Sequence, residues 1–126
     1  MHKGFLTTAA LLGAVSVGLG AFGAHALKQS LSPATLAIYE TAVRYQFYHV
    51  FALALTGVLA AQFAGRQLRL AGILFICGII LFSGSLYLLC FLPAYPWLGA
   101  ITPLGGTCFI AGWIFLALAV RGSGRV

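Results

Sequence analysis

The side chains able to do chemistry are few, and most of them gather on one stretch of the sequence. Tyr45, Gln46 and His49 lie at helical spacing within a largely apolar run, so one side of a helix carries a phenol, an amide and an imidazole. His25 ends an earlier apolar run, and Tyr87 lies near the end of a later one. Because imidazole titrates near neutral pH, these five side chains predict a site that binds a small polar molecule or responds to protons.

Three interpretations of this polar cluster stay open. Gln46 and His49 could bond only to backbone and hydroxyl groups and so fix the helix register, since buried polar groups need partners. With His25, Tyr45 and Tyr87 they could instead form a pocket for a small solute, a proton or a lipid headgroup. His25 and His49 could also hold a haem iron between neighbouring helices, which would make the protein a redox carrier.

Charged side chains are rarer still. Glu40 is the only acidic residue, against seven Lys and Arg, and Arg44 follows it in the favourable order for an ion pair on a helix. One carboxylate cannot supply a Ser/His/acid set or a metal cluster. Cys77, Cys90 and Cys108 also lack metal-ligand spacing. We therefore predict no enzyme activity, no metal and no cofactor.

The elements that position these residues must be membrane helices. The chain has 126 residues, of which 62% are hydrophobic and 6% charged, whereas soluble domains carry about 25% charged residues. A spanning helix needs roughly 20 apolar residues, so four spans use most of the chain as one domain. We place the spans at approximately residues 4–27, 45–64, 70–92 and 103–120.

The first span has some features of a secretory signal. It follows Lys3, and Ala24-His25-Ala26 is similar to a cleavage site. The apolar run from Gly4 to Leu27 is nevertheless longer than the roughly 7–15 residues of a signal-peptide core. We therefore expect a retained helix.

The second span is preceded by a helical extension. Ser32 and Pro33 form a favourable helix start, and no helix breaker follows until Gly57. A helix over residues 33–64 would measure about 48 Å, more than the ~30 Å hydrocarbon core. We therefore expect residues 33–44 to form an amphipathic extension outside the core or along its surface.

Basic residues predict the orientation. Four spans put both termini and a tight turn at Gly65 to Arg69 on one side of the membrane. That side carries five basic residues: Lys3, Arg66, Arg69, Arg121 and Arg125. The other side has only Lys28 and Arg44, so the termini are predicted to lie in the cytoplasm. Basic residues that end apolar runs indicate membrane topology rather than nucleic-acid binding. On this orientation the polar cluster lies in the outer half of the bundle.

Small residues predict which helix packs most closely. In the first span they recur every fourth position in two rows, Ala10/Ala14/Gly18 and Ser16/Gly20/Ala24. Small residues allow close helix contact in lipid, so we expect this span to be the central packing helix. Besides the lipid bilayer, we expect further copies of the chain or a larger membrane complex as partners.

Four ordered motifs carry a resemblance to a known family. They are GAFGAHAL (20–27), the Thr41-Ala42, Tyr45-Gln46 and His49 set, FSGSLY (82–87), and LGAITPLGG (98–106) with Gly112-Trp113. Together they resemble the small bacterial inner-membrane family called domain of unknown function 423, to which eukaryotic transmembrane protein 256 is also similar. The resemblance covers the whole chain. It implies a four-span membrane protein without an established activity, and it supplies no catalytic residues.

The sequence therefore predicts an all-α four-helix bundle in the bacterial cytoplasmic (inner) membrane. We expect its outer-leaflet polar cluster to bind or pass a small solute, a proton or a lipid headgroup. The alternatives are a structural or accessory subunit of a larger membrane complex and a bis-histidine haem protein.

Overall fold

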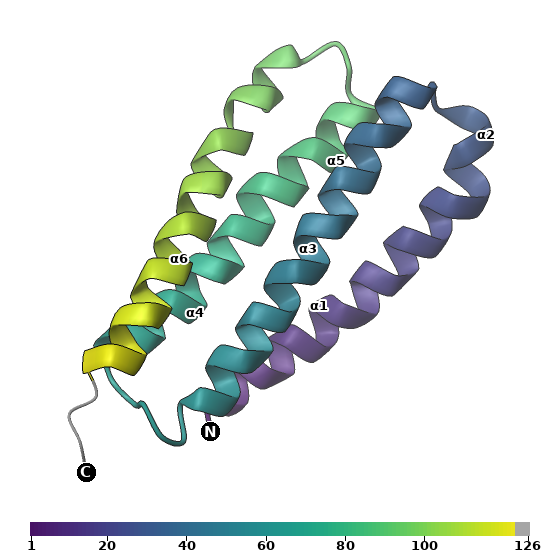
Figure 1. Cartoon of the computed structure of the whole chain (residues 1–126). Helices are drawn as coiled ribbons and strands as arrows, with labels where there is room; N and C mark the ends of the chain where they lie inside the picture. Colours follow the sequence, from purple (N-terminus) through teal and green to yellow (C-terminus); the bar gives the residue numbers. More distant parts are fainter. Residues whose placement is uncertain (123–126) are drawn as a thin grey trace.

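Four long helical rods lie side by side in the computed structural model, which describes residues 1–122 (Figure 1). Every regular element in this range is helical, so the predicted all-α bundle is confirmed. The N-terminus, the connection after α3 and the end of α6 lie at one end of the bundle. The other two connections lie at the opposite end, as an up-and-down order of four helices requires.

Within residues 1–122 the rods are built from nine helical segments. In chain order these are α1 (Lys3–Phe22), η1 (Gly23–Leu27), α2 (Lys28–Ser30), α3 (Pro33–Leu59), α4 (Arg66–Gly78), η2 (Ile79–Ser83), α5 (Gly84–Phe91), η3 (Pro96–Ala100) and α6 (Thr102–Gly122). The segments η1 and η2 are π-helical turns inside the first and third rods, and such turns occur often at functional sites.

The N-terminus of α1 is attached to the end of α3. The ring nitrogen Nδ1 of His2 accepts a hydrogen bond from the Phe5 amide at 3.0 Å, which caps the helix. The His2 amide in turn donates to the Gly57 carbonyl at 2.9 Å. The start of the first rod is therefore fixed to the second rod by a backbone bond.

The start of α3 agrees with the predicted cap. The Ser32 hydroxyl accepts the Thr35 amide at 3.2 Å, and Pro33 occupies the first helical position. Residues 33–44, however, are not a separate surface helix: they are the first turns of α3. Tyr39 and Ala42 are 1% and 0% exposed, because this face packs against the first and third rods instead of lying on the membrane surface.

The connection between the second and third rods differs from the expected one. Helix α3 ends at Leu59 rather than near Ala64, and α4 begins at Arg66, inside the predicted turn at Gly65 to Arg69. The charge of an arginine keeps the start of a helix out of the lipid. It does not prevent a helix from forming there, because arginine is a good helix former.

Helix α1 lies at the edge of the bundle and not at its centre. It packs along α3, while Leu11 and Val17 are 65% and 61% exposed. Of the two rows of small residues, the row that ends at Gly18 faces outward, since a Cβ at Gly18 would meet nothing within 4 Å. The expectation of a central first helix was wrong, because only one of its two rows of small residues is in contact with another helix. That row contains the fully buried Ser16.

Helix α3 occupies the centre and packs on α1, α4 and α5. The third and fourth rods approach each other through glycine. A Cβ added at Gly105 would collide with the backbone of Phe82, and one at Gly78 would collide with the Phe109 ring. Close approach of this kind replaces the hydrophobic driving force that lipid does not provide.

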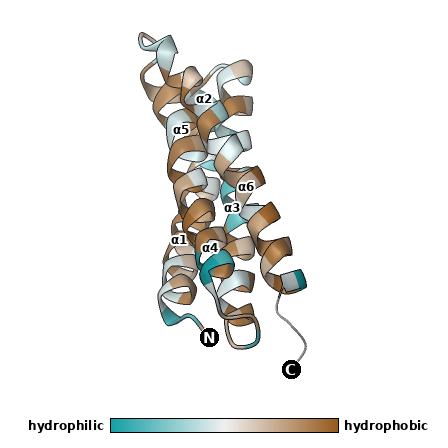
Figure 2. Ribbon diagram, turned by 90° about the vertical axis from the view of Figure 1, so that its left-hand side faces the viewer, coloured by the Kyte–Doolittle hydropathy of each residue, from teal (hydrophilic) through white to brown (hydrophobic). Residues whose placement is uncertain are grey.

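The outward faces of the rods are apolar. Large hydrophobic side chains such as Ile80 and Ile110 are 64% and 65% exposed, and Figure 2 shows hydrophobic colour along the rods, with hydrophilic segments near the termini. In the part of the chain that the structure describes, three helical stretches are long and apolar enough to cross a membrane: Lys3–Ser30, Arg66–Phe91 and Pro96–Gly122. Helix α3 lies among them and carries the polar side chains. The chain is thus a helical, multi-pass membrane protein.

Candidate functional site

Gln46 joins three rods through its amide. It is 2% exposed, and its Oε1 accepts the Tyr87 hydroxyl of α5 at 2.6 Å. Its Nε2 donates to the Leu12 carbonyl of α1 at 3.5 Å, at the limit of hydrogen-bond length. That carbonyl already accepts the Ser16 hydroxyl at 2.7 Å. The predicted association of Gln46 with Tyr87 is therefore a direct bond.

His49 is held in one neutral tautomer. Its Nδ1 lies 2.7 Å from the Tyr45 carbonyl oxygen, which can only accept, so Nδ1 carries the hydrogen. Its Nε2 lies 3.2 Å from Trp113 Nε1, which can only donate, so Nε2 offers its lone pair. A second ring proton would place two donors face to face across that contact.

Apolar rings surround the His49 imidazole. It stacks on Phe109 of α6 with centroids 3.5 Å apart and planes inclined by 8°, and the Phe75 ring of α4 is 5.9 Å away. The imidazole is 5% exposed. His49 therefore lies between α3, α4 and α6, whereas Gln46 bonds toward α1 and α5.

Tyr45 lies at the edge of this cluster. Its side chain is 38% exposed, and the centroid of its ring lies 4.7 Å from the centroid of the Phe82 ring. With His49, Phe109 and Trp113 it lines an open hollow of ≈ 380 Å³ on the outer face of α3 and α6. This hollow faces lipid, because Ile110 on its rim is 65% exposed.

His25 lies apart from the other predicted site residues. It is exposed on η1, a segment whose Gly23 packs against the Tyr39 ring. His49 follows Tyr39 by ten residues on the same helix, or about 15 Å along its axis. The two histidines therefore do not face each other, and the structure does not bring His25 into the cluster.

Glu40 and Arg44 line a separate hollow. It measures ≈ 260 Å³ and lies between the first rod and α3. Besides the two charged residues, its lining consists of Gly20, Gly23, Ala24, Tyr39 and Val43. We call it the Glu40–Arg44 hollow. Both charged side chains are exposed, and their mutual ion pair stays a prediction.

Sequence reasoning missed several hydroxyl groups and the indole of Trp113. Ser83 donates to the Ala42 carbonyl at 2.7 Å, and Tyr39 donates to the Leu19 carbonyl at 2.6 Å. Both bonds connect neighbouring rods. A polar residue inside a span was the available signal for Ser83, whereas Tyr39 belongs to the segment 33–44 that the sequence placed outside the core.

The buried polar side chains of the described residues are hydrogen-bonded within the chain. Within residues 1–122, every buried side-chain nitrogen or oxygen has a hydrogen-bond partner. No three His, Cys, Asp or Glu residues in this range come together as a metal site.

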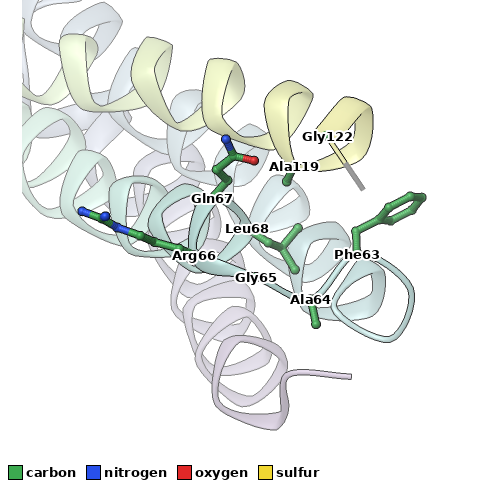
Figure 3. A pocket seen from close by; sticks show the side chains of 8 residues that line it. All are labelled: Phe63, Ala64, Gly65, Arg66, Gln67, Leu68, Ala119 and Gly122. Atoms are coloured by element: carbon green, nitrogen blue, oxygen red, sulfur yellow. The ribbon is translucent and has the colours of Figure 1, made fainter. Parts of the chain in front are cut away.

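Another hollow lies at the end of the bundle that carries the termini. It measures ≈ 330 Å³ and is formed by the start of α4 and the end of α6 (Figure 3). In this view Gln67 extends toward α6, whereas Arg66 points away from Ala119 and Gly122. This hollow shares no residue with the polar cluster.

Comparison with known proteins agrees with the resemblance found in the motifs. Residues 19–106 match the family described as "Protein of unknown function (DUF423)". The UPF0382 membrane protein SH2409 of Staphylococcus haemolyticus is 44% identical over 117 residues, which cover 93% of this chain and 94% of the relative. The UPF0382 membrane protein YwdK of Bacillus subtilis is 42% identical over 118 residues, covering 93% and 95%.

A relative from Haemophilus influenzae, also named UPF0382 membrane protein, is 43% identical over 117 residues, covering 93% of each chain. No solved structure matches the chain. The relatives are bacterial membrane proteins, in agreement with a bundle whose outward faces are apolar. On the match over residues 19–106 and the full-length similarity to these relatives, the chain belongs to the DUF423 family of bacterial membrane proteins.

Proposed function

We propose that this chain is a non-enzymatic membrane protein that binds molecules at its lipid-facing surface and does not pass solutes or protons through its interior. One observation carries the proposal: each buried polar side-chain atom within residues 1–122 already has a partner inside the chain. A conducting path needs polar groups that face water or exchange partners. Binding at the surface needs no such rearrangement.

The surroundings of His49 argue against a proton relay. Both of its ring nitrogens are engaged, with Tyr45 and with Trp113, and its ring neighbours include Phe75 and Phe109. A relay passes a proton between groups that can both accept and donate it, whereas a backbone carbonyl only accepts and an indole N–H only donates. The only carboxylate, Glu40, precedes His49 by nine residues, or about 13 Å along α3.

A haem between His25 and His49 is not part of this proposal. An iron porphyrin held by two histidines needs both imidazoles on opposite faces of one ring. His25 is exposed on η1, while His49 is buried under Phe109 with both nitrogens bonded. These two residues do not fit a shared iron.

The accessory-subunit alternative has one observation in its favour. An apolar hollow of ≈ 490 Å³ follows α3 and α6 toward the end that carries the termini, lined by residues such as Leu55, Trp113 and Leu116. A helix of another membrane protein could pack along this side of the bundle. This alternative is also surface binding, with a protein as the bound molecule.

Vesicles reconstituted with the purified chain test the proposal. With a pH-sensitive dye inside and an imposed proton gradient, we expect the same leak as in protein-free vesicles. The Gln46→Leu and His49→Phe variants should behave alike in this assay. A leak above the protein-free level that either substitution abolishes would contradict the proposal and restore passage through the polar cluster.

A further inference from the structure

The two charged residues of the Glu40–Arg44 hollow indicate that it binds a charged partner. Glu40 is the only acid in a chain of net charge +6, and Arg44 lines the same hollow. Charged side chains are rare in a membrane bundle and are candidate binding positions. The other lining residues are small or apolar, with Gly20, Gly23 and Ala24 on the side of the first rod. They leave room beside the two charges.

The two charges are ordered along the membrane normal. Helix α3 begins at Pro33, at the end of the bundle opposite the termini, so Glu40 is nearer to that membrane surface than Arg44. Four helical residues separate them by about 6 Å along the axis. Along α3, Glu40 is thus the outer residue and Arg44 the inner one.

A phospholipid with a primary amine in its headgroup has the same order of charges. In its covalent order the ammonium is farthest from the acyl chains, and the phosphate lies between the ammonium and the glycerol that carries these chains. A guanidinium binds phosphate through two parallel N–H bonds, and a carboxylate accepts N–H bonds from an ammonium. Resting on the proposed function of surface binding, we propose that the Glu40–Arg44 hollow binds the phosphoethanolamine headgroup of a phospholipid.

The geometry also predicts which headgroups bind less well. A choline headgroup has no N–H to donate to Glu40. A glycerol headgroup carries no cation, so the Glu40 carboxylate would have Arg44 as its only cationic neighbour in the hollow. Both headgroups still offer a phosphate that Arg44 can bind. The preference for a primary amine therefore depends on Glu40. The small and apolar residues that line the rest of the hollow favour a membrane-anchored headgroup over a free one.

Native mass spectrometry of the full chain in detergent tests this inference. The added lipids are phosphatidylethanolamine, phosphatidylcholine and phosphatidylglycerol with matched acyl chains. We expect about tenfold more adduct with phosphatidylethanolamine, the effect of one charge-assisted hydrogen bond. The variant Glu40→Gln should remove this preference and retain phosphate-dependent binding, whereas Arg44→Gln should weaken the binding of all three lipids.

Two further variants separate recognition from folding. The double substitution Glu40→Arg with Arg44→Glu keeps both charges and inverts their order, so the preference should disappear. Ala24→Leu fills the hollow without changing charge and should reduce the phosphatidylethanolamine adduct. Gly18→Leu is its control, because a Cβ at Gly18 meets nothing within 4 Å and Gly18 does not line the hollow. The control should bind as the parent does.

Three outcomes would overturn the inference. The first is equal adduct with the ethanolamine and choline lipids. The second is a preference that survives Glu40→Gln or the charge inversion. The third is displacement by soluble glycerophosphoethanolamine at the same concentration as the lipid, which would make a free headgroup the ligand. None of these outcomes affects the result of the vesicle test, because Gln46 and His49 do not line the hollow. Failure of one proposal can therefore be distinguished from failure of the other.

Discussion

At the scale of residues, the two buried polar side chains of α3 differ in what they connect. Gln46 uses both ends of its amide and joins α1 to α5. His49 connects α3 to α6 through Trp113 and through its stacking on Phe109. Each bond replaces one that water would otherwise make. Removing one partner of such a bond therefore costs more free energy of unfolding than removing both partners together.

This asymmetry predicts the behaviour of the Gln46–Tyr87 pair. Gln46→Leu should lower the free energy of unfolding by about 1–3 kcal/mol, because the Tyr87 hydroxyl then lacks its acceptor. The double variant Gln46→Leu with Tyr87→Phe should recover part of that loss. Unfolding in mixed detergent measures both. Losses that simply add would contradict a direct bond between the two side chains.

The His49–Trp113 contact gives a second prediction. Trp113→Phe removes the donor and frees Nε2 of His49, so we expect a loss of about 1–2 kcal/mol in unfolding free energy. The chemical shifts of 15N-labelled imidazole should show the Nδ1–H tautomer in the parent protein. An Nε2–H tautomer there would contradict the assigned direction of both His49 bonds.

At the scale of elements, glycine determines how closely the third and fourth rods approach. Gly105→Ala would push a methyl group into the backbone of Phe82, and overpacking of this kind costs about 1–3 kcal/mol. Gly84→Ala is the matched control, because a Cβ there meets nothing within 4 Å. The control should be neutral or stabilising, since alanine is the better helix former. Thermal unfolding followed by circular dichroism compares the two variants.

The helices could be predicted from the sequence because their signals are local. Apolar run length, the Ser32–Pro33 start and the family motifs each depend on neighbouring residues. The packing could not be predicted in the same way. Helix α1 carries two rows of small residues, and only its partner α3 decides which row is buried. The Trp113 donor to His49 is 64 residues away in the chain, so no local spacing reveals it.

The candidate site was predicted in part for the same reason. Tyr45, Gln46 and His49 share one helix, as their spacing indicates, but Gln46 bonds toward α1 and α5 while His49 contacts α6. His25 was grouped with them by depth alone. Depth does not specify the side of a bundle on which a residue lies, and the structure places His25 on an exposed surface of η1.

At the scale of the whole molecule, the basic residues concentrate at one end. Lys3, Arg66, Arg69 and Arg121 all lie at the end that carries the termini, and Arg125 lies outside the described residues. This distribution predicts a cytoplasmic location for that end. A protease-sensitive tag after Val126 should be cleaved only when cells are opened. Cleavage in intact cells would show that the orientation is inverted.

The length of α3 connects this topology to the composition of the membrane. Its 27 residues extend about 40 Å, against a hydrocarbon thickness of ~30 Å. About 10 Å of the helix therefore exceeds the hydrocarbon core, and the first turns with Glu40 and Arg44 supply the excess at the end opposite the termini. Short-chain lipids would leave Glu40 and Arg44 among the headgroups, whereas long-chain lipids would submerge them. Occupancy of their hollow should therefore depend on bilayer thickness, and the protein would respond to acyl-chain length as well as to headgroup chemistry.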